Sequence, residues 1–140
     1  YLDEVLRLIS SARSSIDIEQ QYIIEGGPKT RELLQVLRSR KEEVQIRILV
    51  SQAFEEQWEK SVRTLETYEL DPYLRAMDLQ YFIHLHNKGI IIDRSAVVIS
   101  STNWSENSLS RAREAGVLIR SKEVTEYFSE VFDMDWDLGV

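Results

Sequence analysis

Apolar residues recur at helical spacing in four stretches of the chain. Neighbouring apolar positions lie three or four residues apart in each stretch, which places them on one face of an α-helix. We expect helices over residues 2–13, from the turn at 26–28 to the basic run at 38–41, over 54–70 and over 122–132. In the last helix the expected inward residues are Val124, Tyr127, Phe128 and Val131.

Other apolar stretches alternate with polar residues or run continuously, as strands do. The predicted strands cover residues 16–24, 44–50, 79–83, 88–93, 96–100 and 114–120. The runs Ile90–Ile92 and Val97–Ile99 are continuous, which is typical of central strands buried on both faces. Residues 103–111 are polar, and we expect a loop there. This order of elements predicts an α/β layered structure, formed by residues 1–140 as a single domain.

Composition narrows the possible functions. The 140 residues include no cysteine, so disulfides and thiolate metal sites are excluded. The net charge of -7 weighs against a purely electrostatic nucleic-acid binder. No apolar run approaches the roughly 20 residues that span a bilayer. The sequence starts at Tyr1 rather than at a methionine, from which we expect a fragment of a longer protein.

The two histidines of the chain lie close to a lysine. His84, His86 and Lys88 are spaced by two, so on a continuous strand they would project from one face. An ammonium group binds the nonbridging oxygens of a phosphodiester, while a neutral imidazole attacks phosphorus or passes a proton. Ser101 and Asn103 follow a buried strand and provide further donors to those oxygens.

Glu114 is a candidate to orient the catalytic imidazole. A carboxylate that accepts a hydrogen bond from one ring nitrogen of His86 would fix its tautomer, as an aspartate does in a serine triad.

Simpler interpretations exist for the same residues. A histidine and a lysine two residues apart are a weak signal alone, and His84 fits a packing residue better than a catalyst. His84 and His86 could also ligate zinc, but no third ligand is near and Lys88 would repel a cation. Trp104 and Trp136 are most simply packing residues.

The longer pattern resembles a known family. The segments HNKGIIID, SSTNWS and REAGVLI resemble the HxKxxxxD motif of the phospholipase D superfamily, with its later Gly-Ser-x-Asn and Glu-x-Gly segments. The match covers about 35 residues in order and spacing. One position departs from it, because Ser100 stands where the family has glycine, and a positive φ there would strain the phosphate-binding turn.

The resemblance implies a fold and a mechanism. The fold would be a layered α/β/α sandwich with a central mixed β-sheet, as in one half of cardiolipin synthase-type proteins. His86 would form a phosphohistidine or protonate the leaving oxygen, and Glu114 would orient it. Lys88, Ser101 and Asn103 would bind phosphate. Asp93 would be structural, and neither a metal nor another cofactor would be required.

The same resemblance requires two motifs, whereas this chain has one. A homodimer or the missing half of a tandem protein would supply the second motif, and the start at Tyr1 favours the tandem protein. The leading hypothesis is a phosphodiesterase or phosphatidyltransferase domain acting on phospholipid. The alternatives are a metal-independent endonuclease acting as a homodimer on nucleic acid, and a silent half that only completes an interface.

Overall fold

The computed structural model describes residues 1–140. The helices are α1 (Leu2–Ser11), α2 (Pro28–Ser39), α3 (Glu55–Thr67), α4 (Glu106–Ser110) and α5 (Lys122–Leu138), with a short 3-10 helix η1 (Asp71–Tyr73). The strands are β1 (Ser15–Gln20), β2 (Ile23–Ile24), β3 (Gln45–Val50), β4 (Leu74–Ala76), β5 (Gly89–Ile92), β6 (Ala96–Ser100), β7 (Trp104–Ser105) and β8 (Gly116–Ile119). None of the helices has the length and apolar character that crossing a bilayer requires.

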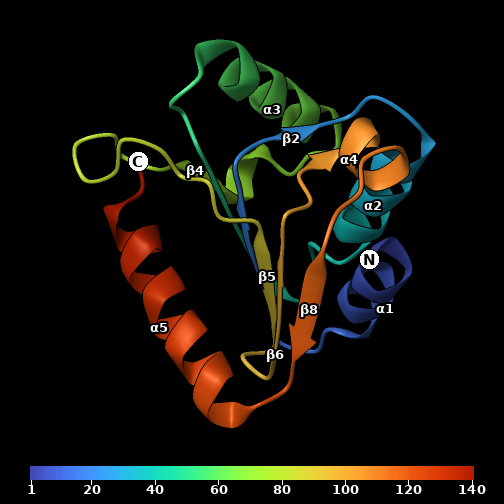
Figure 1. The fold of residues 1–140 in the computed structure, drawn as a ribbon, viewed down its shortest axis with the longest axis vertical. Helices are drawn as coiled ribbons and strands as arrows, with labels where there is room; N and C mark the ends of the chain where they lie inside the picture. Colours follow the sequence, from blue (N-terminus) through green and yellow to red (C-terminus); the bar gives the residue numbers. More distant parts are fainter.

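Six strands form one mixed sheet in the order β4-β3-β1-β5-β6-β8. The strands β1, β3 and β4 are parallel, whereas β5, β6 and β8 pair antiparallel with their neighbours. A second, two-stranded sheet pairs β2 with β7 in parallel. Helices flank the main sheet on both sides (Figure 1), which confirms the expected α/β fold with a central mixed sheet.

The larger part of the core lies on the face covered by α1 and α2. These helices contribute apolar side chains such as Val5, Ile9 and Leu34, which are at most 1% exposed. The facing sheet residues include Ile16 and Ile48, also fully buried. Ile90–Ile92 of β5 are buried as predicted, and so are Val97 and Val98 of β6, because helices cover both faces of these strands. Ile99, at the end of the predicted run, is half-buried.

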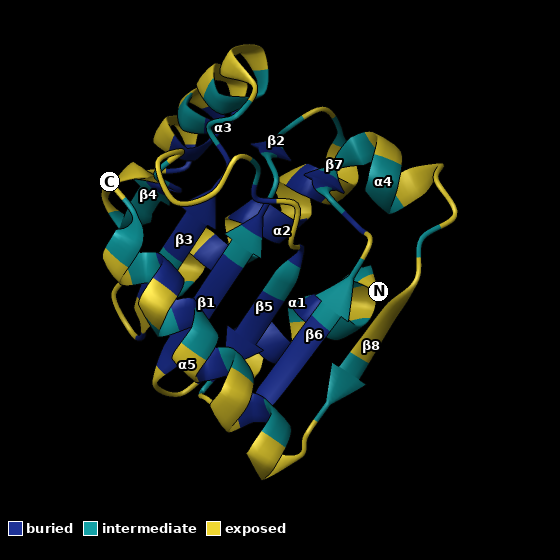
Figure 2. Ribbon diagram, turned by 60° about the vertical axis from the view of Figure 1, so that its left-hand side comes forward, coloured by how far each residue is buried: buried dark blue, intermediate teal, exposed yellow.

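Helix α5 covers the opposite face of the sheet (Figure 2). This face combines apolar packing with charge. Phe132 packs against Leu49, Ile91 and Val97 of the sheet. Arg47 of β3 donates to buried Asp17 of β1 (Nε to Oδ1, 2.7 Å) and pairs with Asp133 of α5 (2.9 Å). These ion pairs fix α5 relative to two strands of the sheet.

Asp93 joins the end of β5 to the turn between α1 and β1. Its carboxylate accepts hydrogen bonds from the backbone N–H groups of Arg13 (3.0 Å), Ser14 (2.7 Å) and Ser15 (3.0 Å), and from the Ser14 hydroxyl (2.9 Å). Burial raises the pKa of Asp93, but these donors together outweigh burial and lower the pKa below its ordinary value. The residue also has a positive φ of 52°, as does Arg94.

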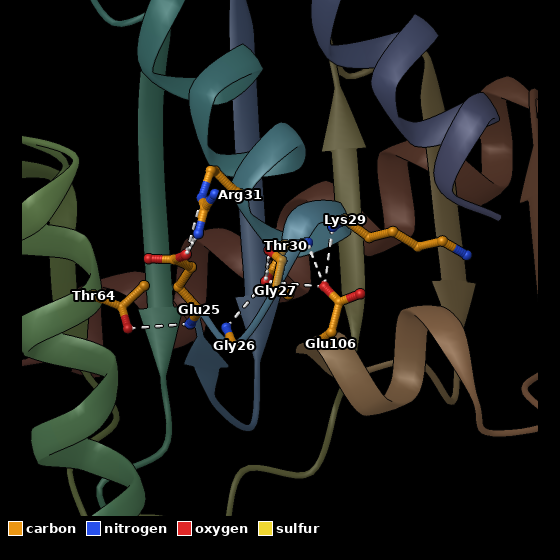
Figure 3. Close-up of polar contacts among 8 residues, drawn as sticks. All are labelled: Glu25, Gly26, Gly27, Lys29, Thr30, Arg31, Thr64 and Glu106. Carbon is orange, nitrogen blue, oxygen red and sulfur yellow. Dashed lines mark hydrogen bonds and ion pairs between the residues drawn. The ribbon is translucent and has the colours of Figure 1, made fainter.

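The start of α2 depends on a residue of α4 (Figure 3). Gly27, the residue that precedes α2, has no side chain to cap the helix. Instead, Oε2 of Glu106 accepts hydrogen bonds from the N–H groups of Lys29 (3.0 Å) and Thr30 (3.2 Å). A Cβ at Gly27 would lie 2.5 Å from the Glu106 side chain, so glycine is needed for this close approach. The contact anchors α4, which directly follows β7 and therefore lies close in sequence to Ser101 and Asn103.

Four expectations about secondary structure are wrong. The strand predicted over residues 16–24 ends at Gln20, and Ile23–Ile24 forms β2 in the separate two-stranded sheet. Residues 79–83 form no strand: the segment turns at 79–81 and Ile83 is 91% exposed. Within 103–111, the expected loop instead contains β7 and α4, whose N-terminus is capped by the side chain of Ser105. Tyr127 is 62% exposed rather than inward, because the buried stripe of α5 runs through Thr125, Ser129 and Phe132.

Replacing Asp93 should destabilise the fold. In Asp93→Asn, the amide presents one acceptor oxygen and its own donors to three N–H groups, so we expect a loss of about 1–3 kcal/mol. The wild-type contribution should be present above the unfolded pKa of about 3.9 and lost as pH falls through the lower folded pKa. Urea unfolding at pH 7 and at pH 3 measures both effects. Asp137→Asn, at an exposed position, is the control, and equal stability of the two variants would contradict the prediction.

Candidate active site

Three segments that carry candidate residues meet at one end of the main sheet. Because β5 is antiparallel to β1 and β6, its beginning lies beside the ends of those strands. The N–H of Ser100 donates to the carbonyl of Lys88 (2.9 Å), and the N–H of Ser101 donates to the carbonyl of Ala115 (2.9 Å). Antiparallel pairing therefore brings together the HxK segment, the Ser-x-Asn segment and the start of β8.

Lys88 is a buried cation at the centre of this end of the sheet. It is 5% exposed, and its Nζ donates to the carbonyl of His86 (2.6 Å) and to Oε1 of Gln21 (3.3 Å). Burial lowers the pKa of Lys88, and the charge of Glu114 partly opposes this shift. The ammonium group has only neutral oxygen acceptors in these contacts, so it retains charge for an anionic ligand.

His86 is exposed and lies beside a second histidine. Its ring centroid is 5.2 Å from that of His84, which contacts Phe54 edge-on at 5.2 Å. The charge of Lys88 lowers the pKa of His86, with smaller contributions from burial and from His84. The imidazole is therefore neutral at pH 7, the form in which it can attack phosphorus.

Ser101 and Glu114 form a polar pair beside this lysine. The Ser101 hydroxyl donates to the Glu114 carboxylate and accepts from the N–H of Ala115 (3.0 Å). The nearby side-chain oxygens of Thr102 and Asn103 are buried without hydrogen-bond partners. Such unsatisfied groups cost free energy in a folded protein and are characteristic of sites that hold a ligand or ordered water.

Ser100, which replaces the glycine of the family pattern, has no positive φ. It pairs with Gly116 of β8, where an added Cβ would lie 2.9 Å from the Cβ of Ser100. The missing side chain of Gly116 thus makes room for the serine, and the turn that follows is not strained by it.

The structure departs from the predicted geometry at two points. His84, His86 and Lys88 do not lie on one strand face, because β5 begins only at Gly89. No hydrogen bond joins Glu114 to His86, since the carboxylate is engaged by Ser101. Asp93 lies at the other end of β5, consistent with the structural role expected for it.

Sequence reasoning missed two residues that support the motif, Glu19 of β1 and Gln21, which directly follows β1. Gln21 contacts Lys88, and Oε2 of Glu19 accepts from Nδ2 of Asn87 (3.2 Å). Both residues are more than 60 positions from the motif, and the predicted strand over residues 16–24 carried no signal that it would lie beside the motif.

A cavity of about 290 Å³ adjoins the motif, between the sheet and α5. His86, Asn87 and Lys88 line one part of it, and Asp17 and Glu19 of β1 line another. The structure contains no cluster of three or more histidine, cysteine, aspartate or glutamate side chains that could hold a metal ion.

Solved structures with the same fold come from several bacteria. Nuc from Salmonella typhimurium, a phospholipase D family member, is 22% identical with a TM-score of 0.79, over 99% of this chain and 88% of that one. NucT from Helicobacter pylori is 18% identical with a TM-score of 0.80, over 99% and 89%. Phosphatidylserine synthase from Haemophilus influenzae is 16% identical with a TM-score of 0.70, over 94% of this chain but 33% of that one. No curated protein sequence matches.

Removing the charge of Lys88 should raise the pKa of His86. In Lys88→Met, the largest cause of the lowering is absent, so the pKa should move up toward the ordinary value of about 6.5. NMR titration of the imidazole signals measures it directly. His84→Gln is the control, with a smaller upward shift because His84 contributes least. An unchanged pKa of His86 in Lys88→Met would contradict the assigned electrostatics.

The family follows from a match along almost the whole chain. Residues 5–136 match the family model described as cardiolipin synthase, PLD-like domain. This match and the shared fold support phosphodiesterase or phosphotransferase chemistry in general. The chain belongs to the phospholipase D superfamily, as a PLD-like domain.

Proposed function

We propose that residues 1–140 form one half of a phosphodiester-cleaving enzyme of the phospholipase D superfamily. The observation that carries this proposal is the meeting of His86, buried Lys88, Ser101 and Glu114 at one end of the sheet. A buried ammonium with only neutral hydrogen-bond acceptors beside an exposed, neutral imidazole suits a negatively charged phosphorus centre.

His86 acts as nucleophile or as general acid. As nucleophile, a ring nitrogen attacks phosphorus, forming a P–N bond while the P–O bond to the leaving group breaks. The histidine of the second motif donates a proton to the leaving oxygen. The second histidine, now neutral, accepts a proton from water or an alcohol. The oxygen of that molecule attacks phosphorus, and the P–N bond breaks. The lowered pKa of His86 supports the nucleophilic role.

The other motif residues bind phosphate and position the histidine. Lys88 and Asn103 bind nonbridging oxygens, and Ser101 assists them. Glu114 orients His86 once substrate binding releases it from Ser101. Asp93 contributes indirectly, by fixing β5 and thereby the position of Lys88 at the start of that strand.

The second motif comes from a homodimer partner or from another half of a tandem protein. This chain covers 88% of Nuc and 89% of NucT, which are chains of similar length. It covers 33% of phosphatidylserine synthase, so a longer relative accommodates the same fold within a larger chain. The exposed position of His86 leaves it accessible to a second half in either arrangement.

We propose phospholipid as the substrate class. The net charge of -7 disfavours a polyanion such as DNA, and the matching family model is described by cardiolipin synthase. The second candidate is a metal-independent endonuclease that acts as a homodimer, supported by the similar length of Nuc and NucT. The intact motif argues against a silent half that only completes an interface.

His86→Asn should abolish turnover. Loss of the reacting imidazole should lower kcat by about 10³-fold or more on the substrate that the wild type cleaves. Assays on phosphatidylglycerol vesicles and on supercoiled plasmid, each with and without chelator, identify the substrate and test metal independence. His84→Gln should lower the rate far less, and full activity in His86→Asn would overturn the mechanism.

Activity should depend on chain concentration if the chain itself provides the second motif. Dilution below the dissociation constant of the dimer should reduce the specific activity, because each monomer carries half of the site. Size-exclusion chromatography at the same concentrations measures the oligomeric state. Specific activity that stays constant in a monomeric sample would exclude the two-motif requirement.

A further inference from the structure

The cavity under α5 has a size that suits one substituent of a phosphodiester. Its volume of about 290 Å³ is at the lower end of small-ligand pockets, roughly 300–1,000 Å³. Its apolar lining comes from both layers, namely Ile91, Val97, Ile99, Phe128, Val131 and Phe132. Because His86 and Lys88 line the same cavity, a phosphate bound at Lys88 would place one of its substituents inside.

Two carboxyl groups of β1 make this cavity unsuitable for a purely aliphatic occupant. Asp17 is 1% exposed; its Oδ1 pairs with Arg47, while its Oδ2 is buried without a partner. Glu19 accepts from Asn87 through Oε2, and its Oε1 is buried without a donor. Buried acceptors of this kind are stabilised by an N–H donor, which an acyl chain does not have.

The charges around Glu19 leave room for a cation. Asp135 of α5 faces it, and burial together with this neighbour raises the pKa of Glu19 to about 8. The nearby cation Arg47 of β3 is engaged by Asp17 and Asp133. His86 and Lys88 of the motif also line the cavity, on the side where the phosphate would bind. Glu19 lines the cavity whereas Asp135 does not, so an ammonium group in the cavity would meet the carboxyl group of Glu19.

We propose that the cavity under α5 is a subsite for a substituent bearing an amino group, held by Glu19 while Lys88 holds the phosphate. The primary ammonium group of a phospholipid headgroup has this chemistry. The subsite rests on the proposed function, because the phosphate at Lys88 directs the substituent into the cavity.

Matched substrates test the subsite through a ratio of rates. The pair is phosphatidylethanolamine with phosphatidylglycerol of the same acyl chains. Phosphatidylethanolamine should have a kcat/KM about tenfold higher or more, the effect of a hydrogen bond to a charged group. Glu19→Gln should bring this ratio close to one, whereas the exposed Glu130→Gln should leave it unchanged.

Direct binding separates failure of the subsite from failure of the proposed function. Calorimetry with glycerophosphoethanolamine and glycerophosphoglycerol needs no turnover, and the amine should bind about tenfold tighter or more. That preference should increase as pH rises toward the Glu19 pKa of about 8, and Val131→Trp should remove it by filling the cavity. Preferential binding together with turnover that His86→Asn leaves intact would support the subsite and overturn the proposed function. Turnover with a ratio near one, or a ratio that Glu19→Gln does not change, would overturn the subsite.

Discussion

The carboxylate of Asp93 is the interaction on which the geometry of the site depends. It accepts three backbone N–H groups of the turn that precedes β1, and it follows the last residue of β5. This contact fixes the antiparallel register in which Ile92 pairs with Ile16 and Gly89 with Glu19. The register in turn places Lys88 beside Gln21 at the opposite end. The seven-residue separation of His86 and Asp93 thus spans the length of a strand, with the chemistry at one end and its anchor at the other.

A second constraint comes from charge buried between the sheet and α5. Buried ion pairs seldom stabilise a fold more than apolar packing of the same volume would, but they demand a defined geometry. Asp17, Arg47 and Asp133 connect β1, β3 and α5, and Arg94 continues the chain of pairs to the turn after β5. Arg47 also lies 4.8 Å from the centre of the Phe132 ring. This arrangement holds α5 at a fixed position while a cavity persists beside it.

Much of the fold was predictable because its strongest signals are local. The helices at 2–11 and 28–39 and the strands at 45–50, 89–92 and 96–100 follow from apolar periodicity. The predicted strand at 79–83 failed because a strand needs a partner, and β4 already occupies the free edge of β3. The polar segment after Asn103 concealed α4, whose position depends on a distant contact between Glu106 and α2.

The residues of the candidate site were also predictable only where they are close together in the sequence. His86, Lys88, Ser101, Asn103 and Glu114 were identifiable because they lie in one continuous part of the sequence with a specific spacing. Their supports were not, because Glu19 and Gln21 lie more than 60 residues away and reach the motif only through strand pairing. The hydrogen bond from Ser101 to Glu114 could not be predicted either, because the pattern of apolar residues does not indicate which acceptor a hydroxyl group binds.

The pairing of early strands with late ones also determines which strands can find a partner while the chain is being synthesised. β1 obtains its partner β3 once residue 50 has been made, but its other edge remains open until β5 is complete at residue 92. β2 waits longer still, for β7 at residues 104–105. A ribosome-bound chain therefore exposes an unpaired strand edge and an apolar sheet face for much of translation, the condition under which nascent proteins aggregate or recruit chaperones.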